Sequence, residues 1–120
     1  MDESIKEHMV AFSKEFIKKE RADRWMGILS SHKPKNLKHS SKLYDHLDRD
    51  YMSRNDELLS VTSDDKIGVF YDFFDAPVKV TFGEAKEMGD GRDAIFSIAA
   101  GKHAVFFFHE NENYELKKKI

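Results

Sequence analysis

The sequence predicts an α+β fold in which N-terminal helices pack on a mostly antiparallel, meander-like sheet of about five or six strands. In the first third of the chain, apolar residues recur every three or four positions, as they do along one face of a helix. From residue 57 onward they alternate with other residues, as they do in strands. Helices followed by a run of strands are typical of the α+β class.

Two helices are predicted within the first 30 residues. The first apolar stripe consists of Ile5, Met9, Phe12 and Phe16. A second stripe, with Trp25 and Leu29, is out of phase with the first, so we expect a bend or break near residues 20–23. Pro34 ends this helical region, because the residue before a proline avoids helical backbone angles.

Residues 33–42, with the sequence KPKNLKHSSK, are predicted to form a loop or linker. Ser40 or Ser41 can cap a third helix. The apolar face of that helix consists of Leu43, Tyr44, Leu47 and Tyr51. Asn55 and Asp56 are expected to end it.

The sheet is predicted from segments with alternating apolar residues, at 59–61, 67–74, 78–82, 94–99, 103–109 and 114–118. The segment 67–74 is apolar on both faces, which predicts an interior strand. Thr81 and Glu84 have the spacing of a capping box and predict a short helix over 83–88, closed by Gly89. Apolar residues on both sides of 106–108 require cover on both faces of the sheet, which favours a homodimer or another protein partner.

One domain is predicted over residues 1–120, with a helical part over 3–54 and a sheet part over 57–118. The chain has 120 residues and a mass of 14.0 kDa, which suits one core, and neither layer alone buries enough apolar surface to be stable. Ten Phe, four Tyr and one Trp are too many large apolar side chains for a disordered chain.

The composition excludes several chemistries. The chain has no cysteine, which excludes disulfides, thiolate metal sites and cysteine nucleophiles and favours a cytoplasmic location. Apolar runs reach only five residues, far short of the roughly 20 that a membrane span needs. The acidic N-terminus also lacks the basic start of a signal peptide. We therefore expect a cytoplasmic protein with no membrane partner.

No catalytic residue, metal site or cofactor is expected. His32, His39 and His46 recur every seven residues, which on a helix places neighbours roughly 10.5 Å apart, too far to share a metal ion. None of the serines lies in a nucleophile motif. These observations favour a non-enzymatic function.

An acidic segment suggests a protein partner. The whole chain has a net charge of −2, but residues 43–75 contain nine acidic and three basic residues. Such a segment can steer a basic partner and orient it. We expect Asp45, Asp48 and Asp50 to lie at the rim of the interface and Tyr51 to be its anchor. The alternative is an ordinary solvated face with acidic turn residues.

The first functional hypothesis is therefore a small, non-enzymatic protein-interaction domain of inhibitor, immunity or regulatory type. The alternative is a ligand-binding or enzymatic domain. Its pocket would be lined by phenylalanines of the sheet, with Asp72, His103 and His109 as polar groups inside it. A filled core would argue against this function.

A phosphate contact through the basic segment is the third hypothesis. The residues concerned are Lys33, Lys35, Lys38 and Lys42. Nucleic acid is nevertheless not the favoured partner, because the segment contains no aromatic residue and is bordered by Asp45 and Asp48. This hypothesis requires the lysines to converge with Arg21 and Arg24 on one face.

Overall fold

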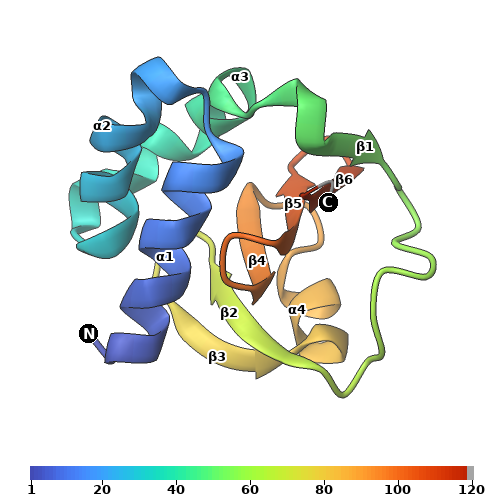
Figure 1. The fold of residues 1–120 in the computed structure, drawn as a ribbon. Coiled ribbons are helices and arrows are strands. Elements are labelled where there is room, and N and C mark those ends of the chain that lie inside the picture. The colour runs from blue at the N-terminus through green and yellow to red at the C-terminus, as the bar shows by residue number, and fades with distance from the viewer. Residues whose placement is uncertain (119–120) are drawn as a thin grey trace.

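The computed structural model describes residues 1–118, in which a layer of helices covers one face of a six-stranded sheet and a short helix covers the other (Figure 1). The helical layer consists of α1 (Glu3–Phe16), α2 (Lys19–Ser30), η1 (Pro34–Lys42), α3 (Leu43–His46) and η2 (Arg49–Tyr51). The strands are β1 (Met52–Arg54), β2 (Ile67–Tyr71), β3 (Val78–Thr81), β4 (Ala94–Ala99), β5 (His103–Phe108) and β6 (Glu112–Lys117). The short helix α4 (Phe82–Met88) connects β3 to β4.

The strand order is β1-β6-β5-β4-β2-β3, and all neighbouring strands are antiparallel. Strands β4, β5 and β6 form a meander, and β2 and β3 form a hairpin. The register places Tyr71, Ile95, Phe106 and Tyr114 in one row across the sheet. Side chains in such a row share a face, and these four belong to the core beneath the helices. The predicted α+β class and meander-like sheet are confirmed.

The first two helices form as predicted, with the break slightly earlier. Asp2 caps α1 by accepting hydrogen bonds from the backbone N–H groups of Ser4 and Ile5. The buried apolar face of α1 consists of Met9, Phe12 and Phe16. Ile17 then becomes extended and pairs with Leu47, which ends α1 and places α3 beside it.

The segment predicted as a loop or linker is the 3-10 helix η1. The side-chain amide of Asn36 is buried and donates hydrogen bonds to the carbonyls of Ile28 and Ser31, 2.9 and 3.0 Å away. These bonds attach η1 to the end of α2. A 3-10 helix has three residues per turn, so it shows no 3.6-residue apolar stripe, and its polar composition resembles that of a loop.

The third predicted helix is mostly replaced by other structure. Helix α3 ends at His46, and the chain continues through η2 into the edge strand β1, which pairs with β6. The strand predicted at 59–61 is absent, because Leu58 and Ser60 have positive φ angles of 56° and 57°. Leu58 and Val61 instead turn inward and are buried.

Strand β2 is an interior strand, as predicted, but it ends at Tyr71 rather than at residue 74. Phe73 has a φ of 68°, a left-handed conformation that is rare for a bulky residue, and it turns the chain out of the sheet. The Phe73 ring is buried against Tyr71 and Trp25, with centroids 4.7 and 6.3 Å apart. Phe74 consequently points outward.

Both faces of the sheet are covered by this chain. The core opposite the helices contains Phe70, Phe96, Val105 and Phe107 from the sheet. Helix α4 contributes Phe82 and Ala85 to this core, and the segment before β2 contributes Leu58 and Val61. The sequence argument for a homodimer, which assumed an uncovered sheet face, therefore does not hold.

The predicted capping box at the start of α4 is confirmed. The Thr81 hydroxyl accepts a hydrogen bond from the Glu84 N–H at 3.2 Å, and the Glu84 carboxylate accepts one from the Thr81 N–H at 2.9 Å. Gly89 follows the helix with a φ of −84°, so a left-handed turn is not what requires glycine here. A Cβ at Gly89 would lie 2.7 Å from the Phe107 ring, so only glycine allows this close approach.

Candidate functional site

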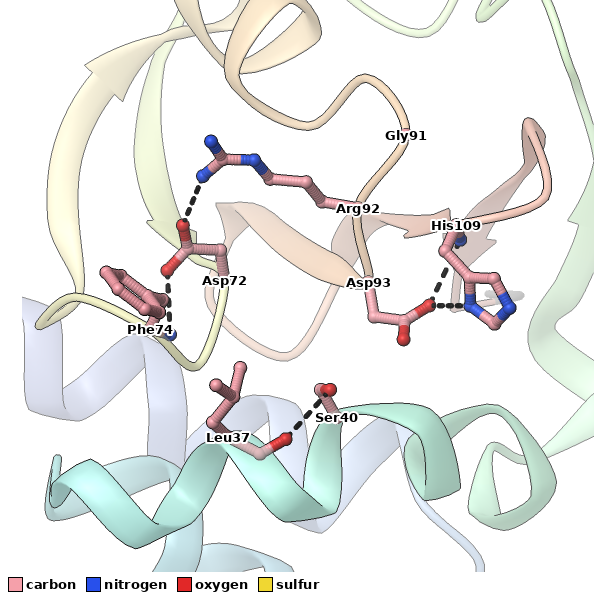
Figure 2. Close-up of a pocket in the computed structure, with 8 residues that line it drawn as sticks. All are labelled: Leu37, Ser40, Asp72, Phe74, Gly91, Arg92, Asp93 and His109. Atoms are coloured by element: carbon pink, nitrogen blue, oxygen red, sulfur yellow. Dashed lines mark hydrogen bonds and ion pairs between the residues drawn. The ribbon is translucent and has the colours of Figure 1, made fainter.

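A pocket of about 360 Å³ lies where η1 meets three loops at one end of the sheet (Figure 2). We call it the Phe74 pocket. Its lining residues are Leu37, Ser40, Asp72, Phe74, Gly91, Arg92, Asp93 and His109. They come from η1, the β2–β3 turn, the α4–β4 loop and the β5–β6 turn. Segments far apart in the sequence therefore build one site.

Asp72 organises the turn on one side of the pocket. Its Oδ1 accepts hydrogen bonds from the backbone N–H groups of Phe74 and Asp75, both at 3.0 Å. Its Oδ2 accepts a hydrogen bond from Nη1 of Arg92 at 2.9 Å. Asp72 is buried and all of these bonds are charge-assisted, so the turn that presents Phe74 is held firmly in place.

Arg92 supplies the accessible positive charge of the pocket. Gly91 precedes it with a φ of 70°, which lets the α4–β4 loop turn toward Asp72. The Arg92 side chain remains 59% exposed, and within residues 1–118 only its Nη1 has a protein acceptor. The other guanidinium N–H groups are available to a carboxylate or carbonyl of a bound molecule.

His109 and Asp93 form a second charged pair. Nδ1 of His109 lies 2.7 Å from Oδ1 of Asp93, and the backbone N–H of His109 donates to the same oxygen at 3.0 Å. The side-chain hydrogen bond to Asp93 raises the pKa of His109, and the negative charges of Asp93 and Glu110 add to this effect. The arrangement therefore favours the imidazolium form.

Two apolar side chains complete the pocket. Phe74 is 65% exposed and Leu37 is 46% exposed, and both line the same hollow. In Figure 2 they project from opposite walls, Leu37 from η1 and Phe74 from the β2–β3 turn. The pocket thus combines an apolar contact with a guanidinium and an imidazole, which pair with Asp72 and Asp93 respectively. The remaining N–H groups of Arg92 suit a ligand group that is apolar at one end and carries a hydrogen-bond acceptor such as a carboxylate at the other.

The three residues predicted as polar groups of a pocket do not all lie together. Asp72 and His109 do line the same pocket. His103 does not, since it lies at the other end of β5, where its Nε2 is 2.6 Å from Glu115. Most of the phenylalanines are buried in the two cores, and Phe74 is the one that lines this pocket.

The acidic residues predicted to contact a partner lie on α3 and just after it. Asp45 and Asp50 are exposed, while Asp48 caps η2 by accepting a hydrogen bond from the Asp50 N–H. The Tyr51 ring packs against Phe16, and Nζ of Lys118 lies over it at 4.1 Å. No observation tests their role in binding, so it stays a prediction.

The predicted phosphate-binding lysines are all exposed. Lys33 immediately precedes η1, and Lys35, Lys38 and Lys42 lie along it. Within residues 1–118, none of the four forms an ion pair with a carboxylate.

Sequence reasoning missed Arg92, Asp93 and Leu37. Phe74 was included only among the phenylalanines of the sheet, because the segment 67–74 was predicted to be one strand. Arg92 binds an aspartate 20 residues away, a distance over which local patterns carry no information. The acid at residue 72, directly after an apolar strand, was the available signal for a structured turn.

The part of the chain that the structure describes contains neither a cluster of metal-ligating side chains nor a helix that could span a membrane. Among residues 1–118, no three His, Asp or Glu side chains are arranged to hold a metal ion. Among the helices of the same residues, none has the length and apolarity needed to cross a bilayer.

Comparison with known proteins identifies no relative: no family model, curated protein or solved structure matches this chain. Any functional assignment therefore depends on the geometry of the Phe74 pocket and of the surrounding surface.

Proposed function

We propose that this chain is a small cytosolic protein-interaction domain of inhibitor, immunity or regulatory type, without enzymatic activity, and that it contacts its partner at the Phe74 pocket. The observation that supports this most directly is the exposed Phe74 ring on a turn braced by Asp72. Exposed aromatic and arginine side chains that lie together are typical of residues that dominate protein interfaces.

The rigidity of the turn favours binding. The backbone N–H groups of Phe74 and Asp75 are held by Asp72, and Arg92 holds the same carboxylate from the next loop. Burial of the neighbouring Phe73 fixes the turn from inside the molecule. A side chain that is already in its bound position loses little conformational freedom when a partner binds, which strengthens association.

The chemistry of the pocket defines the partner segment. An apolar side chain of the partner would fit between Leu37 and Phe74, and a carboxylate beside it would bind the free N–H groups of Arg92. The hydrogen bond to Asp93 raises the pKa of His109, so its imidazole adds a second basic group at the same rim. We therefore expect a partner loop or terminus with an apolar tip and an adjacent acidic residue.

The pocket is preferred to the predicted acidic segment as the anchor of the interface. The Tyr51 ring already packs against Phe16 and Lys118 of the same chain, whereas the Phe74 ring is exposed to solvent. Asp45, Asp48 and Asp50 remain proposed rim charges, and a variant that reverses two of them tests this separately.

Binding of a small molecule is a second candidate function. The volume of about 360 Å³ is within the usual range for ligand pockets, and the apolar and charged walls suit a compact carboxylate with an apolar part. A thermal-shift screen of such carboxylates tests this candidate, with Arg92→Gln as the variant that should lose any shift.

The experiment that tests the proposal is affinity capture with the tagged protein from native lysate, after nuclease treatment and at two salt concentrations. Phe74→Ser is the test variant. Leu59→Ser is the matched control, because Leu59 is also 65% exposed but lies in the segment before β2. Asp45→Lys with Asp48→Lys tests the acidic segment.

We expect one stoichiometric protein partner that binds the wild type and Leu59→Ser but not Phe74→Ser. Equal capture by Phe74→Ser and wild type would place the interface elsewhere, and loss of the partner only in the Asp45 and Asp48 variant would place it on the acidic segment. Absence of any stoichiometric partner would reject the interaction function.

A further inference from the structure

A second surface, independent of the Phe74 pocket, lies across α2 and η1. Residues 18–42 contain eight basic and two acidic residues, a net charge of +6, while the whole chain carries −2. The charge of this small protein is therefore strongly polarised, with its positive end in the helical layer. We define the basic surface as Arg24, Lys35, Lys38 and Lys42, all four of which are exposed.

Helices α2 and η1 are joined firmly, so the basic surface has a fixed shape. Trp25 of α2 is buried, and its ring lies edge-on to His39 of η1, with centroids 6.3 Å apart. Nε1 of Trp25 also donates a hydrogen bond to His46 at 2.8 Å. Asn36 completes the attachment through the carbonyls at the end of α2. Arg24 precedes Trp25 in α2, the helix that these contacts hold against η1.

His39 lies on η1 against Trp25 of α2, and the charges of the basic surface act on its ring. Burial lowers the pKa of His39, and the neighbouring charges that act on it all lower it further. These charges are Lys38, Arg24, Lys42 and Lys35. These four cations therefore act on one imidazole. The condition set by the sequence, convergence of the lysines with both Arg21 and Arg24, is met only in part, because Arg24 is among these charges and Arg21 is not. Arg21 instead acts on His46.

The ion pairs found among residues 1–118 lie outside the basic surface. Elsewhere in residues 1–118, cations such as Arg54, Lys86 and Lys118 pair with carboxylates at 2.7–2.9 Å. Within the same residues, none of the four cations of the basic surface has such a partner. Asp45, which borders the segment in sequence, acts on His46 and is not among the charges that act on His39.

The three-residue repeat of η1 separates this surface from the Phe74 pocket. Leu37 and Ser40 are three residues apart and share the face that lines the pocket. Lys35 and Lys38 are also three residues apart and share a different face. One short helix can therefore contact two ligands on two sides.

We propose that the basic surface binds the phosphate backbone of double-stranded nucleic acid without reading its sequence. Clustered exposed cations without carboxylate partners are the electrostatic signature of backbone binding. Single strands are disfavoured, because they bind through exposed aromatic rings and Trp25 is only 2% exposed. A membrane surface is disfavoured because η1 offers one exposed apolar side chain, Leu37, where an interfacial helix needs an apolar face.

Fluorescence anisotropy with a labelled 20-base-pair DNA duplex and the corresponding RNA duplex tests this proposal, at salt concentrations from 50 to 200 mM. If four phosphates are contacted, the logarithm of the association constant falls with the logarithm of salt concentration with a slope of about −3.6. Arg24→Gln should reduce the magnitude of the slope by about 1. Lys35→Glu with Lys38→Glu removes two contacts and should weaken binding roughly 60-fold at 100 mM salt.

The matched control is Lys6→Glu with Lys66→Glu. Both of these lysines are exposed, both lie outside the basic surface, and the change in net charge is the same. This control should lose far less affinity than the Lys35 and Lys38 variant. Phe74→Ser should bind the duplex as the wild type does, so failure of this proposal and failure of the proposed function are distinguishable.

Equal weakening by the control and the test variant would show a general charge effect and overturn the proposal. Tighter binding to a single strand than to the duplex would overturn it as well. Competition arms with polyglutamate and with vesicles containing 30% phosphatidylserine complete the test. If polyglutamate bound as tightly as the duplex, the basic surface would be assigned to an acidic protein instead. If the vesicles bound as tightly as the duplex, it would be assigned to a membrane.

Discussion

Two glycines show how differently the same residue type is constrained at different positions. Gly68 lies in β2, where a Cβ would be 2.6 Å from both the Phe96 ring and the Ser97 carbonyl. Gly27 lies in the exposed middle of α2, where a Cβ would meet nothing within 4 Å. Close packing within the sheet requires glycine at position 68. At position 27 no packing requires glycine, and its low helix propensity only weakens α2.

Alanine substitutions should therefore have opposite effects at these two positions. Gly68→Ala should lower the free energy of unfolding by about 1–3 kcal/mol, because the strand and the Phe96 ring must move apart. Gly27→Ala should raise it by about 1 kcal/mol, because alanine has the higher helix propensity. Urea denaturation measures both, and a neutral Gly68→Ala would contradict the close approach.

His109 and Asp93 should make stability depend on pH. The pKa of His109 is raised above its ordinary value of 6.5 in the folded protein, chiefly by the hydrogen bond to Asp93. The folded state therefore binds the proton more tightly than the unfolded state. This stabilisation is complete below pH 6.5 and is lost as pH rises through the folded-state pKa.

Asp93→Asn keeps an acceptor for the His109 N–H and removes the charge. The difference in unfolding free energy between wild type and this variant should be largest near pH 5.5 and should shrink toward pH 9. NMR titration of the imidazole measures the pKa directly. Glu110→Gln is the control and should lower this pKa less, since Glu110 is 3.8 Å from the ring. A wild-type pKa at or below 6.5 would refute the pairing.

At the scale of elements, η1 depends on a single buried amide. Asn36 connects it to α2 through two carbonyls, and its Nδ2 lies 3.3 Å from the Tyr71 hydroxyl at the end of β2. The same hydroxyl lies 3.0 Å from Nδ1 of His32. Helix η1, α2 and β2 therefore meet at one polar cluster inside the apolar layer.

Asn36→Ala should loosen η1 without unfolding the sheet. It removes the donor from the partly buried carbonyls of Ile28 and Ser31, which should cost about 1 kcal/mol or somewhat more. Hydrogen exchange over residues 34–42 should accelerate, while exchange in β4 and β5 should follow only the global change. Ser41→Ala, at an exposed position of η1, should leave exchange unchanged. Equal acceleration in both variants would show that Asn36 does not anchor η1.

At the scale of the whole molecule, the two cores share one sheet. Phe106 faces the helices and Phe107 faces α4, although they are neighbours on β5. Each core therefore supports the strands that the other requires, so separating the helical layer would expose one face of the sheet and weaken the strands on which the second core depends.

Unfolding should accordingly be a single transition. Phe96→Ala empties part of the core opposite the helices and should cost about 3–5 kcal/mol. Fluorescence of Trp25, which lies in the helical layer, should shift in urea by the same amount as far-UV circular dichroism. A Trp25 transition that stays in place while the circular dichroism transition moves would show two independent units.

Local patterns were sufficient for α1, α2, α4 and the strands β2 to β6, but not for η1 or β1. Alternation predicted β4 over 94–99 within its observed bounds, and the Thr81 and Glu84 pair predicted the start of α4. Predictions failed where long-range contacts decided the conformation. Phe73 takes a left-handed turn because burial against Trp25 stabilises it, and Leu58 turns inward to cover the sheet face.

The candidate site was only partly predictable for the same reason. Asp72 and His109 were predicted as polar groups of a pocket because of their residue types, and both line the Phe74 pocket. Their partners Arg92 and Asp93 are 20 and 16 residues away in the sequence. Contacts between such loops form only because the sheet places the ends of different strands side by side.

The sequence by itself determined the class of fold, because the spacing of apolar residues states which elements form and which faces they bury. It also determined the polarised charge, since that is a property of composition along the chain. Only the tertiary structure decided that the Phe74 pocket exists and that α2, which carries Arg24, packs against η1 with its lysines. Periodicity reports on neighbours within one element, whereas both sites arise where separate elements meet.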